Sequence, residues 1–159
     1  MIPPESWIVF FEWCEATFLG RVVRESIWMF PIIEALHLTA LCLIGGAILV
    51  VDLRLLGFGL TNQRPSALAR HVRPWLMAGL AVMLSTGVLL FLSEAIKCFY
   101  NTSFWVKMMT LPVALTFTFV IRARALDGLD TSARSRAIGF ASIALWFTVA
   151  AAGRWIGYS

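Results

Sequence analysis

The sequence predicts an all-α fold: an integral membrane four-helix bundle, preceded by an N-terminal amphipathic helix that lies in the membrane interface. Of its 159 residues, 60% are hydrophobic and 14% are charged. The mean hydropathy of +0.82 is far above that of a soluble domain. Four apolar windows are long enough to cross the hydrocarbon core of a bilayer as helices. Because lipid offers the backbone no hydrogen-bond partners, apolar runs of this length must be helical.

The windows place the four spans at about 28–53, 74–94, 103–121 and 138–157. The segments between them are short, so residues 1–159 are expected to form a single membrane domain. Residues at about 4–20 mix Trp and Phe with Glu, which is typical of a helix in the interface plane. That stretch has no Lys or Arg and no small-residue cleavage site, so it does not match a signal peptide.

Arginines predict the orientation, because they gather in the loops after the first and third spans. These arginines are Arg54, Arg64, Arg70 and Arg73, then Arg122, Arg124, Arg134 and Arg136. By the positive-inside rule both loops are cytoplasmic, which leaves both termini outside a bacterial inner membrane. The net charge of +4 then reflects topology, with anionic membrane lipid as the natural partner. No nucleic-acid partner is expected, since these arginines form no basic helix face with interleaved aromatics.

Five ionisable residues lie in the outer parts of the spans. His37 is about 13 Å below the outer boundary of the first span, and Glu34 lies one turn above it. Lys107 enters the third span, while Glu94 and Arg154 end the second and fourth. Charges in hydrocarbon are expensive unless they are paired or face a cavity, so this set marks a candidate site.

Haem b is the cofactor that such a set favours. Its iron takes an axial imidazole, its ring takes apolar walls, and its propionates take Arg or Lys. His37 is therefore the expected axial ligand and Arg154 the propionate partner, with Glu34 orienting His37 or taking a proton. Glu94 adds a carboxylate at the same level. Lys107 is expected either as the second ligand or as a propionate partner.

The sixth ligand stays open between Lys107, Met108, Met109, a water molecule and none. His71 is excluded, because it lies about 22 Å from the level of His37 along the bundle. Pro112 should kink the third span and free the Met108 carbonyl beside Lys107.

The function expected from these residues is electron transfer between membrane quinol and a periplasmic redox partner, or haem-dependent oxidation of a tetrapyrrole-like substrate. Three alternatives remain. A cofactor-free proton or small-solute transporter subunit would use Glu34, His37, Glu94 and Lys107. A copper-handling protein would use His37 with Cys42, Met29, Met108 and Met109. In a purely structural subunit, the polar cluster would only fix helix register. A homo-oligomer would bury more of the aromatic surface.

Several other polar residues receive local interpretations. Asp52 is expected to pair with Arg54 or to be solvated at its helix end. Ser85 and Thr86 should bond to carbonyls of their own helix. Cys14 and Cys98 both fall on the outer side, where either a disulfide or two free thiols would fit. Gly45 and Gly46 would let a neighbouring helix or a flat ligand come close.

Four stretches resemble an uncharacterised bacterial family of small four-span membrane proteins. They are EALHLTALCLIGGAILVVDLRLLG, LSTGVLLFLSEA, FWVKMM and AAAGRWIGY, and the likeness runs from about residue 30 onward. A histidine early in span one with Trp-x-Lys opening span three is also distantly similar to the haem-associated protoporphyrinogen oxidase family and to copper-resistance D-type membrane domains. The likeness to the oxidase family implies haem-binding roles for His37 and Lys107.

Overall fold

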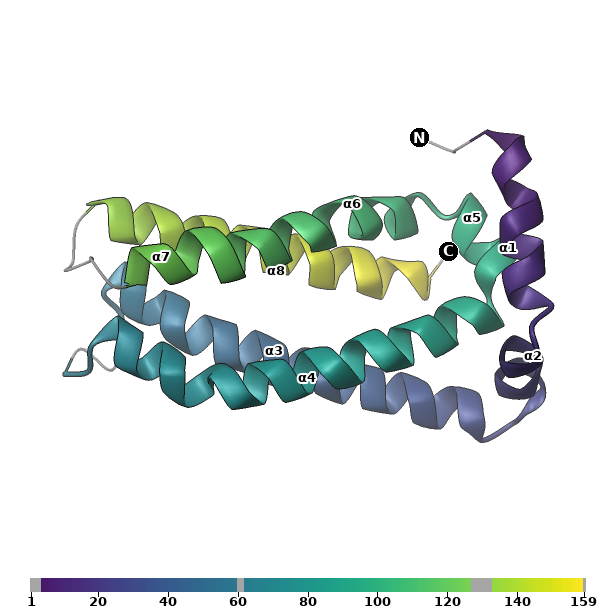
Figure 1. The fold of residues 1–159 in the computed structure, drawn as a ribbon, viewed down its shortest axis with the longest axis horizontal. Coiled ribbons are helices and arrows are strands. Elements are labelled where there is room, and N and C mark those ends of the chain that lie inside the picture. Colours follow the sequence, from purple (N-terminus) through teal and green to yellow (C-terminus); the bar gives the residue numbers. More distant parts are fainter. Residues whose placement is uncertain (1–3, 60–61, 127–132, 159) are drawn as a thin grey trace.

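The computed structural model describes residues 4–59, 62–126 and 133–158, and in these ranges the chain is almost entirely helical (Figure 1). Four segments are long and apolar enough to cross a membrane: α3 (Met29–Leu56), α4 (Pro65–Ser93), the continuous helical segment Thr102–Arg122, and α8 (Ala133–Ile156). The segment Thr102–Arg122 consists of α6 (Thr102–Thr116) and η2 (Phe117–Arg122), which α7 (Ala123–Leu126) extends. The shorter elements are η1 (Glu5–Trp7), α1 (Ile8–Glu15), α2 (Phe18–Glu25) and α5 (Ala95–Tyr100). The prediction of an all-α four-helix membrane bundle is therefore confirmed.

The second span begins earlier than its hydropathy suggested. Helix α4 starts at Pro65 rather than near Pro74, which lies inside the helix. Pro65 occupies the first turn, where the missing N–H leaves no hydrogen bond unmade. The extra turns carry Arg70 and Arg73, so these two arginines stand on a helix and not in a flexible loop.

The two ends of the bundle differ (Figure 1). At one end, here called the terminal end, α1, α2 and α5 gather beside both ends of the described chain, with α1 running across the long helices. At the other end, here called the loop end, α3 and α7 end and α4 and α8 begin. The two termini thus lie at the same end of the bundle.

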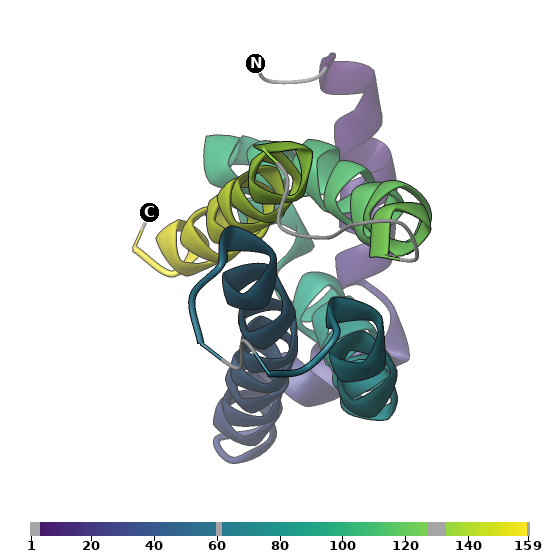
Figure 2. The same cartoon turned by 90° about the vertical axis from the view of Figure 1, so that its left-hand side faces the viewer.

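The four long helices do not pack equally against one another. Helix α3 packs extensively on α4 and on α8, and α8 packs on α6, whereas α4 and α6 have no extensive interface. The end-on view shows α3 beside α8, and α4 apart from α6 (Figure 2). The side on which α4 faces α6 is here called the open seam.

Aliphatic side chains fill the middle of the bundle. Ile44, Ile48, Leu80, Met83 and Val149 are buried there with Trp146 and several alanines. Helix α4 approaches α3 most closely at Gly79, where an added Cβ would lie 2.8 Å from Cγ1 of Ile44. A residue larger than glycine would force these two helices apart.

The N-terminal layer is two short helices rather than the single interfacial helix expected at about 4–20. The chain breaks at Thr17, whose side chain caps α2 by accepting a hydrogen bond from the Gly20 N–H. Helix α1 docks on α5 through Glu15, whose carboxylate accepts the Ile96 N–H at 2.8 Å. Phe11, Phe99 and other aromatic residues fill the contact. This layer closes the terminal end of the bundle.

The third span changes its winding after Pro112. Pro112 lies inside α6, and from Phe117 the backbone follows a π-helix as far as Arg122. A π-helical stretch rotates the following side chains relative to a regular helix. The side chains of Thr118 and Arg122 in this stretch point into the protein and are both buried.

Candidate functional site

The site centres on His37, which is half-buried in α3 near the terminal end. Its Nδ1 lies 2.9 Å from the Thr86 hydroxyl on α4. That hydroxyl donates to the carbonyl of Val82 at 2.6 Å, so its oxygen is left to accept from the imidazole. The hydrogen therefore sits on Nδ1 of His37, and Nε2 carries a bare lone pair. The imidazole also lies within reach of the Met83 carbonyl on α4, and within the described ranges no hydrogen bond to Nε2 is found.

Glycine makes room for this ring. An added Cβ on Gly87 of α4 would lie 3.3 Å from Cε1 and 3.8 Å from Nδ1 of His37. The imidazole thus rests directly on the α4 backbone, one residue after the threonine that holds it. Thr86 and Gly87 together fix both the rotation and the depth of the ring.

Lys107 of α6 is the second ionisable group of the site. Its side chain lies along α8, where a Cβ added to Gly153 would be 3.5 Å from Nζ. Its ammonium is near enough to His37 and to Cys98 for its charge to act on both. The structure therefore brings together His37, Thr86 with Gly87, Lys107 and Gly153 from four different helices, and we call this set the histidine site.

The other predicted site residues lie around this centre. Glu34 is exposed on α3, and the described residues include no partner for it. Glu94 forms a weak ion pair with Lys97, at 3.9 Å. Arg154 is exposed and donates to the Tyr158 hydroxyl at 2.6 Å while its guanidinium lies 4.7 Å from the centre of that ring. No hydrogen bond or ion pair joins any of these three described residues to His37.

Sulfur ligands do not converge on the histidine. Met108 and Met109 are exposed, the latter with 71% of its surface free, and Cys42 faces outward from α3. Among the described residues there is no group of three or more His, Cys, Asp or Glu side chains placed to share a metal ion. Gly45 and Gly46 also face outward, with no atom within 4 Å of an added Cβ.

His71 lies well away from the histidine site. It is exposed on α4 and its Nδ1 donates to the carbonyl of Ala67 at 2.9 Å. Thr86, which touches His37, is fifteen residues further along the same helix, or about 22 Å. The separation expected between the two histidines is confirmed.

Cys14 and Cys98 are free thiols buried in the aromatic layer of the terminal end. Burial raises the pKa of the Cys14 thiol. Burial, aided by the Glu94 carboxylate, raises the pKa of Cys98 to about 11. Of the two sequence-based alternatives, the structure has the pair of thiols.

The interpretation of Asp52 was wrong. Asp52 is completely buried, and its Oδ1 lies 2.9 Å from Nε of Arg122, while Arg54 donates instead to the Gln63 carbonyl. Its helical spacing from Ile44 and Ile48 places it on the core face of α3, a signal that the sequence already contained. Arg122, assigned to a loop from sequence, belongs to the buried end of the third span.

The prediction for Thr86 was correct but incomplete. It does bond to the Val82 carbonyl of its own helix, as does Ser85 to that of Ala81, but it also holds His37. Ser85 faces outward and makes no such contact. Hydropathy does not distinguish two adjacent hydroxyls, so only the rotation of α4 against α3 separates them.

Four apolar helices of membrane-crossing length, with polar groups converging between them, define a multi-pass helical membrane protein. Residues 10–159 match a family described as "Family of unknown function (DUF6644)", and the chain belongs to that family. No curated protein and no solved structure matches the sequence. The expected membership of an uncharacterised family is confirmed, and its activity must be argued from the site.

Proposed function

We propose that this protein binds haem b through His37 and passes electrons between quinol in the bilayer and a redox partner at its terminal end. The observation that carries the proposal is the imidazole held at Nδ1 by Thr86, with Nε2 free among the described residues. Histidines that ligate metals typically have their other ring nitrogen fixed in this way. A porphyrin brings four equatorial nitrogens, so one protein ligand is enough to attach it.

The residues around His37 fit such a group. Gly87 makes room for the imidazole of His37 and Gly153 for the side chain of Lys107, so both candidate ligands lie directly on helix backbone. The buried aliphatic side chains Ile44 and Met83 lie further into the bundle and would form apolar walls. Haem, when bound, would supply a one-electron redox couple. The protein's part is to supply the ligand, exclude water and neutralise the propionates.

Lys107 has two roles open to it, ligand or propionate partner. Its charge reaches His37, and its Nζ lies on Gly153 of α8 rather than in a salt bridge with any described carboxylate. Substitution separates the roles. Lys107→Arg keeps a cation for a propionate but cannot ligate iron, whereas Lys107→Met keeps a ligand and loses the cation.

Arg154 and Glu34 would act at the edge of the site. Arg154 is held by Tyr158, so pairing with a propionate requires that its side chain turn away from that hydroxyl. Because Thr86 already orients His37, the role left to the exposed Glu34 is to accept a proton released on quinol oxidation. Glu94 can serve the same purpose once it parts from Lys97.

The alternatives have less support. Proton transfer through the bundle would need polar groups between His37 and the Asp52–Arg122 pair, but the described core there is built from residues such as Ile44 and Ile48. Copper handling would need soft donors beside His37, and Met108 and Met109 point away from the core. We place the protein in a bacterial inner membrane, with the terminal end outside, on the basis of the arginine-rich loops.

An absorption spectrum tests the proposal. The full chain, purified in detergent from haem-replete cells, should show a Soret band that sharpens and shifts when air-oxidised protein is reduced with dithionite. His37→Ala should abolish the band. The matched control is His71→Ala, which removes the other histidine and should leave the spectrum unchanged, because His71 is exposed and far from the site.

A colourless protein that stays colourless when titrated with haem would overturn the proposal. So would a wild-type spectrum in His37→Ala. If the band persists in Lys107→Arg but loses its low-spin character, lysine is the second ligand; an unchanged spectrum in Lys107→Arg with haem loss in Lys107→Met assigns it to a propionate.

A further inference from the structure

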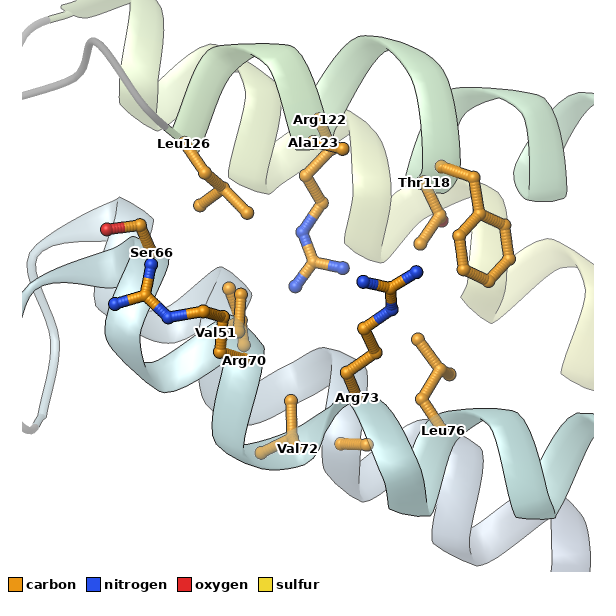
Figure 3. A pocket seen from close by; sticks show the side chains of 13 residues that line it. Val51, Ser66, Arg70, Val72, Arg73, Leu76, Thr118, Arg122, Ala123 and Leu126 are labelled. Atoms are coloured by element: carbon orange, nitrogen blue, oxygen red, sulfur yellow. The ribbon is translucent and has the colours of Figure 1, made fainter.

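A cavity lies at the loop end, beside the Asp52–Arg122 pair and separate from the histidine site. It has a volume of about 320 Å³ and lies between α4 on one side and η2 with α7 on the other, with Ala47 and Val51 of α3 as its floor. Figure 3 shows Arg73 from α4 and Arg122 from η2 extending toward each other across it, with Arg70 nearer the loop end (Figure 3). We call it the arginine pocket.

The pocket has an excess of positive charge. Arg70, Arg73 and Arg122 contribute three guanidinium groups, and only Arg122 has a carboxylate within ion-pair distance among the described residues. Arg122 is 4% exposed, so this cation is built into the protein and does not extend freely into water. Arg70 and Arg73 are exposed, so solvent partly screens their mutual repulsion, and a bound anion would supply the counter-charge that neither has among the described residues.

The remaining walls are mostly apolar, with Ser66 and Thr118 as the polar exceptions. They come from residues such as Val72, Leu76, Phe119 and Leu126, which surround the guanidinium groups on the bundle side. The pocket also lies along the open seam, where α4 and the third span have no extensive interface. A ligand can therefore present a charged head to the arginines while its apolar part stays in the seam.

We propose that the arginine pocket binds a phosphate group carried by an amphiphile such as an anionic membrane lipid. Guanidinium groups recognise phosphate oxygens through paired hydrogen bonds, and Arg70 and Arg73, which pair with no described carboxylate, offer enough donors for both non-bridging oxygens of one phosphodiester. The apolar walls and the open seam select an amphiphile over a free anion. The site is independent of haem, since the Asp52–Arg122 pair and the apolar core separate it from His37.

The test compares short-chain lipids on the full-length protein in a neutral detergent, with binding counted by native mass spectrometry. Dioctanoyl phosphatidylglycerol should bind at least tenfold more tightly than dioctanoyl phosphatidylcholine, which carries no net charge. Arg70→Gln with Arg73→Gln should remove that preference. The matched control, Arg64→Gln with Arg136→Gln, removes two exposed arginines from the same end that do not line the pocket, and should retain it.

Both double variants change exposed side chains, so their melting temperatures should match that of the wild type. If the two double variants lose lipid binding equally, the preference for anionic lipid comes from the general surface charge of this end, and the proposal is overturned. No preference for the anionic lipid would overturn it as well. The last experiment is a competition with inorganic phosphate. If an equal concentration of phosphate displaces the lipid, the pocket binds the free anion, and the proposal that it binds an amphiphile is overturned.

Discussion

Nε of Arg122 lies 2.9 Å from Oδ1 of Asp52, with 5% and 0% of the two side chains exposed. The pair links α3 to the π-helical end of the third span, and Nη2 of Arg122 also donates to the Ile48 carbonyl at 3.3 Å. Helix α8 lies against the same residue, since Gly139 packs on the Asp52 carbonyl. Three of the membrane helices therefore meet at one buried charge pair.

Breaking this pair should be strongly destabilising. Asp52→Asn leaves the buried guanidinium without a counter-charge, at an expected cost of about 3–5 kcal/mol in the free energy of unfolding. Asp52→Asn with Arg122→Gln should cost clearly less than the sum of the two single changes, because no lone charge remains. Unfolding of the three variants in detergent measures this. Additive losses would show that the two groups stabilise the fold separately.

Removing the Thr86 hydroxyl should weaken haem binding without unfolding the bundle. Thr86→Val keeps the shape of the side chain but frees Nδ1 of His37, so the affinity for haem should fall by about 10–100-fold. Haem titration of the apoprotein gives the affinity. Ser85→Ala is the control, because Ser85 bonds only to carbonyls of its own helix. If both changes lower the haem affinity equally, the hydrogen bond from His37 to Thr86 does not contribute to haem binding.

Gly87→Ala should displace the imidazole by steric contact. Its new Cβ would lie 3.3 Å from Cε1 of His37, closer than an ordinary contact. We expect a shifted Soret maximum and several-fold less haem per protein. Gly45→Ala makes the same change on α3 where no atom lies within 4 Å, so its spectrum should equal that of the wild type. An unaltered spectrum in Gly87→Ala would mean that the ring does not need this space.

Gly20→Ala should detach part of the N-terminal layer. An added Cβ would collide with the Leu92 carbonyl of α4, which is backbone and cannot turn aside. Overpacking of this kind costs about 1–3 kcal/mol. Limited proteolysis should cut the segment before α3 faster in Gly20→Ala than in Gly46→Ala, whose surroundings are empty. Equal cleavage rates in the two variants would show that Gly20 does not hold α2 tightly against the bundle in the wild-type protein.

Cys98 should react with thiol reagents very slowly at neutral pH. With its pKa near 11, only about one thiol in a thousand is ionised at pH 8, and the side chain is buried. Its alkylation rate, followed by mass spectrometry, should rise about tenfold per pH unit up to that pKa. Rapid labelling of Cys98 at pH 7 would contradict its burial. Cys98→Ser identifies its share of the signal.

The same pKa predicts a loss of stability in base. An unfolded thiol titrates near 9 and the folded Cys98 near 11, so between these values the folded state holds a proton that the unfolded state has lost. The free energy of unfolding should therefore fall as pH rises through this window. Cys98→Ala should show a shallower fall than the wild type over the same range.

The sequence predicted the membrane class well because hydropathy and length decide it. It also placed His37 and Lys107 at similar depths, since helical rise alone sets depth. It did not predict that Thr86 holds His37, because that contact depends on how α4 is rotated against α3. The pairing of Asp52 with Arg122 was missed for a related reason: the π-helical turn after Pro112 changes where the arginine points.

The missing interface between α4 and the third span has a mechanical consequence. Among the four long helices, the pair α3 and α4 is joined to the pair α6 and α8 chiefly through the contact of α3 with α8, to which the Asp52–Arg122 pair adds a link between α3 and the third span. That contact is tight at Gly139, where an added Cβ would lie 3.0 Å from the Asp52 carbonyl oxygen. The two helix pairs are thus held together mainly at α3 and α8, whereas the open seam between α4 and α6 lacks an extensive interface. We expect hydrophobic molecules dissolved in the bilayer to enter through the open seam, so that their supply depends on partitioning into lipid rather than on their concentration in water.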